Sequence, residues 1–120
     1  MPVTFNTANG SVEVSTEVIA TIVGSSTTEI FGVVGMTSQN AVRDNVRQIL
    51  RQENFSKGVR VHSDEEGTII DIFVVISYGV KLSEVARNIQ ERVRFNLESQ
   101  LGLTNVKVNV NVQSVKVVAD

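Results

Sequence analysis

Apolar and polar residues alternate near the start of the chain, a pattern typical of strands with one buried face. Residues 3–5 and 12–14 alternate on either side of Asn9-Gly10, a pair that favours a tight turn. We therefore predict an N-terminal hairpin. The short apolar run 30–36 contains two glycines and predicts a further strand with tight bends or close backbone contacts.

A second hairpin is predicted where residues 58–62 and 68–77 flank the polar turn 63–67. The returning strand is apolar on both faces, so one face is assigned to the core. Its other face carries Phe73 and Val75. That face is covered if the strand is central in a sheet, or else it belongs to a partner.

The last predicted strand begins after Thr104 and is rich in valine. The valines occupy even positions from 106 to 112 and then the odd positions 115 and 117. A regular strand would turn the last two valines to the solvent face, so the change predicts a β-bulge at Gln113-Ser114.

The first predicted helix follows Ser15, which is suited to the N-cap position, and ends near residue 29. Its apolar residues recur at helical spacing over the first turns. Residues 24–28 are small and have low helix propensity, and their size permits close packing.

Two more helices are predicted at 39–53 and 81–101. Phe55 is interpreted as an anchor just beyond the former, and Gly102 as a left-handed cap of the latter. Phe95 falls on the polar side of the helix at 81–101. It is either covered, for instance by the N-terminal hairpin, or exposed as a contact for another chain.

These elements predict one α+β domain over residues 1–120. A mixed or antiparallel sheet, built from the two hairpins and the last strand, packs against two or three helices. The apolar residues on faces that should be wet, namely Phe73, Val75 and Phe95, favour self-association into a homo-oligomer.

The amino-acid composition excludes several kinds of site and disfavours some partners, but it indicates no particular function. The net charge of -2 and pI near 5.4 provide no general attraction to nucleic acid, so that partner is not favoured. With 0 cysteines, disulfides, thiolate zinc sites and a cysteine nucleophile are excluded. No signal peptide is recognised, and the uncharged runs are too short and polar to span a bilayer.

No catalytic, cofactor-binding or metal site is predicted. His62 is the only histidine and stands near the carboxylates of 64–66, which we interpret as a solvated turn. Asp71 lies on a mainly apolar strand face without an evident partner in the sequence. The GxxG string at 32–35 matches the motif of KH domains but suits a buried strand better.

A basic stripe is the basis of an alternative function. Arg43, Arg47 and Arg51 recur every fourth residue along the predicted helix 39–53. Such a stripe could bind nucleic acid, an anionic surface or an acidic partner, although a plain solvated helix face shows the same pattern.

The order of several short motifs along the chain resembles the alkaline shock protein family, small envelope stress response proteins of Gram-positive bacteria. The matching pieces, in chain order, are Gly10-Ser11-Val12-Glu13-Val14-Ser15 with Glu17-Val18-Ile19, Glu29-Ile30-Phe31-Gly32-Val33-Val34-Gly35-Met36, Lys57-Gly58-Val59, Tyr78-Gly79, Ile89-Gln90-Glu91-Arg92-Val93 and Val108-Asn109-Val110.

The resemblance implies a cytoplasmic, non-enzymatic protein linked to cell-envelope stress or alkaline shock. It also implies that the protein can be peripheral to the membrane through a membrane-associated protein partner. The family is known for no catalytic residues, so none are carried over to this chain.

Overall fold

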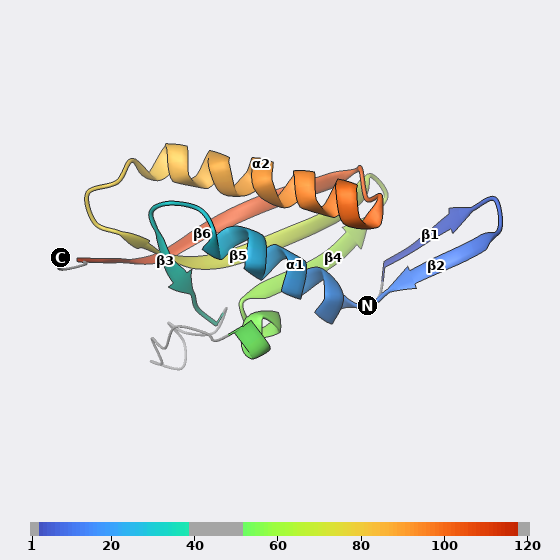
Figure 1. The fold of residues 1–120 in the computed structure, drawn as a ribbon, viewed down its shortest axis with the longest axis horizontal. Coiled ribbons are helices and arrows are strands. Elements are labelled where there is room, and N and C mark those ends of the chain that lie inside the picture. Colours follow the sequence, from blue (N-terminus) through green and yellow to red (C-terminus); the bar gives the residue numbers. More distant parts are fainter. Residues whose placement is uncertain (1–2, 39–51, 118–120) are drawn as a thin grey trace.

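Strand β5 (Gly67–Ser77) is the central strand of the main sheet in the computed structural model, which describes residues 3–38 and 52–117. On one side it pairs in parallel with β6 (Val106–Lys116). On the other side it pairs antiparallel with β4 (Val59–Asp64) and then β3 (Val33–Met36), which follow one another along its length. Both edges of β5 are therefore occupied by other strands (Figure 1).

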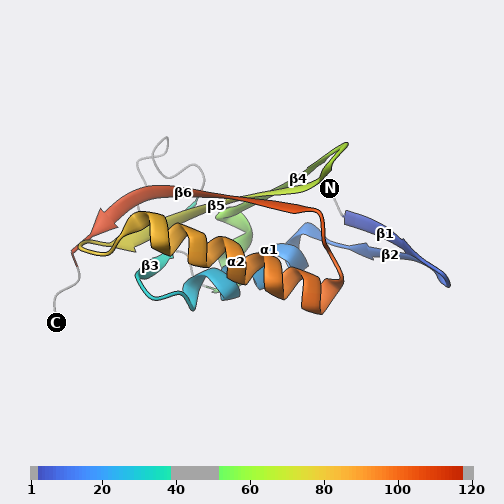
Figure 2. The same cartoon turned by 90° about the horizontal axis from the view of Figure 1, so that it is seen from above.

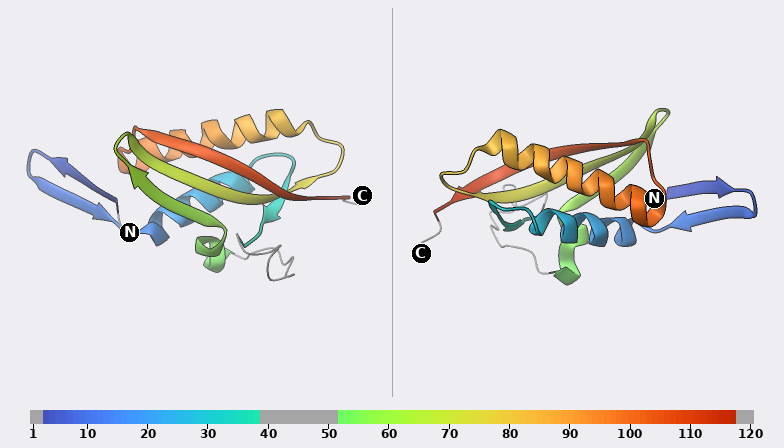
Figure 3. Two further views of the ribbon diagram at one scale, coloured as in Figure 1. Left: turned by 180° about the vertical axis from the view of Figure 1, so that it is seen from behind. Right: turned by 45° about the horizontal axis from the view of Figure 1, so that its top comes forward.

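Two helices, α1 (Thr16–Thr28) and α2 (Leu82–Leu101), cover one face of this sheet (Figure 2). Helix α2 connects β5 to β6, as a parallel strand pair requires of its crossover. Viewed from behind, the opposite face of the sheet carries neither α1 nor α2 (Figure 3, left). The α+β class is confirmed, and the sheet is mixed.

The hydrophobic core lies between the sheet and the two helices. One face of β5 contributes four almost completely buried side chains, and α2 contributes an apolar stripe at helical spacing. Burying each such side chain contributes about 1.5–3 kcal/mol. The residues are Ile70, Ile72, Val74 and Ile76 from the strand and Val85, Ile89, Val93 and Leu97 from the helix.

The N-terminal hairpin, β1 (Val3–Thr7) and β2 (Gly10–Val14), forms a sheet of its own and projects from the domain (Figure 1). The prediction that this hairpin belongs to the main sheet is therefore wrong. Val3 and Val14, at its base, join the core, while the rest of β2 is exposed. Its two strands pair with each other, and no strand of the main sheet among the described residues pairs with either of them.

Three local predictions are confirmed. Ser15 caps α1 by accepting a hydrogen bond from the backbone N–H of Val18 at 3.3 Å. Gly102 ends α2 in the left-handed conformation with φ of 74°. The pairing of β5 with β6 moves from Val74–Val112 to Val75–Ser114, which leaves Gln113 as the extra residue of a bulge.

A short 3-10 helix, η1 (Gln52–Lys57), precedes β4 and anchors it to α1. Phe55 is buried in the core, as predicted, and its ring lies directly against Gly24 of α1. A Cβ atom at Gly24 would overlap this ring, so the small residue predicted to permit close packing does so here. The predicted helix at 39–53 lies outside the described residues except for its last two positions, which begin η1.

We predict that Gly24→Ala lowers the free energy of unfolding, although alanine is the better helix former. The helical preference favours alanine by about 1 kcal/mol, whereas overpacking against Phe55 costs about 1–3 kcal/mol. The expected net loss is up to about 2 kcal/mol, measured by urea unfolding monitored by circular dichroism.

The neighbouring substitution Ser25→Ala serves as the control, because it changes the helix preference without placing an atom against Phe55. It should leave stability within about 0.5 kcal/mol of the wild type. Equal or higher stability of Gly24→Ala would contradict the packing argument.

Candidate interaction surface

A tight turn between α1 and β3 places Phe31 at the surface. The backbone N–H of Val33 donates to the carbonyl oxygen of Ile30 at 3.1 Å, so Phe31 and Gly32 are the two central residues of the turn. Gly32 has φ of 99°, as the second central residue of a type II turn requires. Phe31 therefore lies at the corner, with 87% of its surface exposed.

The turn is held firmly on both sides. The carbonyl oxygen of Gly32 accepts a hydrogen bond of 2.8 Å from the backbone N–H of Ser77 at the end of β5. A Cβ atom at Gly32 would lie 3.0 Å from Val85 of α2, which shows how closely the turn approaches that helix. The exposure of Phe31 thus comes from a fixed backbone.

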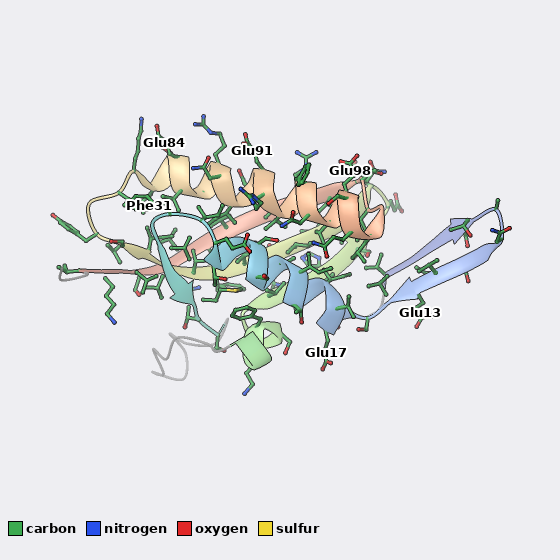
Figure 4. The ribbon with its side chains drawn as sticks, viewed as in Figure 1. Glu13, Glu17, Phe31, Glu84, Glu91 and Glu98 are labelled. Carbon is green, nitrogen blue, oxygen red and sulfur yellow. The ribbon has the colours of Figure 1, made fainter. Side chains whose placement is uncertain are left out.

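Phe95 of α2 is the second exposed aromatic side chain on this side, with 67% of its surface accessible. The alternative in which the N-terminal hairpin covers it is therefore wrong. Phe31 and Phe95 line the same open hollow of about 370 Å³, together with Glu29, Ile30, Asn88, Glu91 and Arg92. Figure 4 shows Phe31 beside the start of α2 and Glu91 projecting from that helix.

A second hollow of about 340 Å³ adjoins the first at Phe31. Its lining is mainly aliphatic and comes from the turn before β3, the start of β3, the end of β5 and the loop that follows: Gly32, Val33, Val34, Ser77 and Val80. Phe31 therefore stands between a mixed polar and aromatic hollow and an apolar one. We call the two hollows together the aromatic surface.

Polar contacts join α1 and its C-cap residue to α2 beside the aromatic surface. The side-chain amide of Asn96 donates to the Ser26 hydroxyl at 2.7 Å, and Asn96 follows Phe95 directly. Arg92 and Glu29 lie 3.9 Å apart with about half of each side chain exposed, which makes a weak ion pair. The Phe95 ring is thus presented by a helix that is tied to α1, and the Phe31 ring by the turn that follows α1.

The other two predicted contact residues lie on the opposite face of the sheet. Phe73 is half-buried, and Val75 is only 7% exposed, although the main hydrophobic core includes neither of them. The structure therefore does not bring Phe73 and Val75 together with Phe95. Of the three, Phe95 presents the most surface.

A polar cluster on this same sheet face joins three strands. Asp71 of β5 is buried, and its Oδ2 accepts hydrogen bonds from Arg60 Nε at 3.0 Å and Nη2 at 2.8 Å. His62 Nε2 lies 3.1 Å from the same oxygen. Oδ1 accepts from the side-chain amide of Asn109 at 2.8 Å. The interpretation that Asp71 has no partner is wrong, because β4 and β6 supply three.

These contacts set the charge state of Asp71. Burial by itself raises the pKa of this carboxyl, but the hydrogen bonds from Asn109, Arg60 and His62 and the positive charge of Arg60 outweigh it. The net effect is a pKa below the ordinary value of 3.8. Asp71 is thus a carboxylate whose acceptor positions are used within the sheet, which is a structural role.

The remaining candidates are placed as follows. His62 is exposed, as expected for a strand end, but it contacts Asp71 rather than only solvent. Within residues 3–38 and 52–117, no group of three or more potential metal ligands is found. The GxxG string at 32–35 consists of the turn residue Gly32 and the start of β3, in accord with the strand interpretation. Arg43, Arg47 and Arg51 lie outside the described residues.

Comparison with known proteins identifies the family. The profile of the alkaline shock protein 23 family, described as having a cell envelope-related function, matches residues 4–117. The chain belongs to this family. The resemblance that the motifs indicated is therefore confirmed, and a cell envelope-related function follows at the level of the family.

Relatives from two bacteria match this chain in sequence over most of their length. The uncharacterized protein Spy1614 of Streptococcus pyogenes serotype M6 is 59% identical over 100% of this chain and 99% of its own. The uncharacterized protein YloU of Bacillus subtilis is 41% identical over 98% of each chain. Among solved structures, a variant of MamM-CTD aligns with a TM-score of 0.49 and 11% identity over 85% of this chain and 100% of that one, too low to argue from.

Neither α1 nor α2 is long and apolar enough to cross a bilayer, and no other helix among the described residues is.

Two features escaped the sequence argument. Residues 30–36 were expected to form one strand, but β3 begins only at Val33, and Gly32 was the signal that a turn precedes it. Phe31 was therefore assigned to a strand instead of the surface. The register that sets Arg60 opposite Asp71 becomes known only from the pairing of β4 with β5.

We predict that Asp71→Asn lowers the free energy of unfolding by about 2 kcal/mol at pH 7, because charge-assisted hydrogen bonds are lost within the sheet. The lowered pKa means that the stabilising effect of the carboxylate is complete above pH 3.8 and is lost as pH falls through the folded-state pKa. Urea unfolding of both proteins between neutral and acidic pH measures the difference.

The matched control is Glu98→Gln on α2, which removes an exposed carboxylate. Its effect on stability should be within about 0.5 kcal/mol. A wild-type advantage over Asp71→Asn that stays constant down to the lowest pH would refute the assignment.

Proposed function

We propose that this chain is a non-enzymatic interaction or scaffold protein linked to the cell-envelope stress or alkaline-shock response, and that it acts through self-association and protein partners. The observation that carries the proposal is the aromatic surface, where Phe31 and Phe95 stay exposed on a rigid scaffold. An exposed aromatic side chain contributes nothing to the core, whereas it provides a large contact area to a partner.

A scaffold role is also consistent with the chemistry of the described residues. The best-connected ionisable group, Asp71, has its acceptor positions used by neighbouring strands. The proposed location is the cytoplasm, with attachment to the membrane periphery through a membrane-associated protein partner. The support for this location is membership of a family with a cell envelope-related function.

The alternative, binding of nucleic acid or an anionic surface by Arg43, Arg47 and Arg51, stays a prediction. Since these residues lie outside the described part of the chain, their arrangement adds nothing for or against it. Salt-dependent binding that a triple glutamate substitution abolishes would support this alternative.

Sedimentation of the purified protein across a range of concentrations tests the proposal. We expect the wild type to associate as its concentration rises into the high micromolar range. Phe95→Glu should shift the equilibrium toward the monomer, because it replaces an aromatic contact with a charge that self-association would have to desolvate.

Gln100→Glu is the matched control, since it adds the same charge on the same helix at an exposed position outside the aromatic surface. This variant should associate like the wild type. A wild type that remains monomeric at every concentration would refute self-association.

A further inference from the structure

The first hollow of the aromatic surface combines aromatic rings with carboxylates. Phe31 and Phe95 provide two exposed rings, and Glu29 and Glu91 provide two acidic groups on the same lining. Rings attract cations through the negative face of the π system, and carboxylates attract them by charge. The hollow therefore offers both interactions that a cationic side chain uses.

The charge balance of the lining favours a positive occupant. Arg92 is its one basic residue and lies 3.9 Å from Glu29, at the limit of an ion pair. Glu91 forms no ion pair with any residue that the structure describes. Two carboxylates against one guanidinium leave a net charge of about -1 on the lining.

A purely apolar occupant would remove water from Glu91 without replacing its interactions, which is unfavourable. An anionic occupant, such as a lipid headgroup, would be repelled by the same carboxylate. A lysine or arginine side chain would instead contact the rings with its stem or guanidinium plane and bring its charge to Glu91.

The second hollow indicates which type of partner side chain lies next to the lysine or arginine. It is lined by Val33, Val34 and Val80 and shares Phe31 with the first hollow. An apolar side chain fits there, because burial of aliphatic surface is favourable and few polar groups need partners. Since one ring borders both hollows, the two side chains of the partner would lie close together in its chain.

We propose that the aromatic surface binds a protein segment in which a lysine or arginine stands beside an apolar residue. The cationic side chain occupies the hollow at Phe95 and Glu91, and the apolar one occupies the hollow at Val80. This inference rests on the proposed function, because it assumes that the surface binds protein, and it adds the chemistry of the partner.

Selection from a displayed library of random peptides on the full-length protein tests the inference. Selection on the wild type, with counter-selection on Phe95→Ser, should enrich peptides that place lysine or arginine next to an apolar residue. Each enriched peptide is then synthesised and its Kd measured, both as selected and with glutamine replacing the basic residue.

The glutamine version should bind at least about fivefold more weakly, and Glu91→Gln should weaken the parent peptide by a similar factor. Glu84→Gln is the matched control, because Glu84 lies on the same helix and does not line the hollow (Figure 4). This control should change the Kd by less than about twofold.

Two outcomes would overturn the inference. The first is that no selected peptide requires Phe95 for binding. The second is that the enriched peptides lack a basic residue and that their Kd is unchanged by Glu91→Gln. Neither outcome bears on self-association, which sedimentation measures separately. Conversely, a monomeric wild type that binds the basic peptides would refute self-association and support the inference. A second copy of this chain as the source of the segment would appear as dissociation of oligomers on addition of the peptide.

Discussion

The central position of β5 is the constraint on which the rest of the structure depends. Its backbone groups are shared between β6 on one side and β4 with β3 on the other, so every strand of the main sheet is placed by it. Its inward face supplies four side chains that are almost completely buried in the core. The two helices dock on that face, and the outward face of β5 carries Phe73 and Val75 beside the buried Asp71.

Periodicity was informative wherever one face of an element is buried. The valines of β6 revealed the bulge at Gln113 because each side chain must return to the same face. The caps of the helices could be predicted from Ser15 and Gly102, since both depend on local chemistry. The position of the N-terminal hairpin could not be predicted from the sequence. Nothing local distinguishes a strand that joins the main sheet from one that pairs only with its neighbour.

Only one of the two exposed aromatic residues of the candidate site could be predicted from the sequence. Phe95 could be found because it interrupts the polar side of a well-patterned helix. Phe31 could not, since an aromatic residue in an apolar run looks like core until the turn at Gly32 is known. Surfaces built from two distant segments, here the end of α1 and the middle of α2, depend on tertiary packing that periodicity does not report.

The cluster around Asp71 also disfavours an incorrect register of β5 in the sheet. Side chains alternate along a strand, so a slip of β5 by one residue would carry this carboxylate from the outer face into the apolar layer beneath the helices. There it would lose Arg60, His62 and Asn109 together and remain an unpaired charge in a dry environment. A single acidic residue in a run of isoleucines and valines thus makes the wrong alignment costly, in a strand whose two apolar faces would otherwise tolerate it.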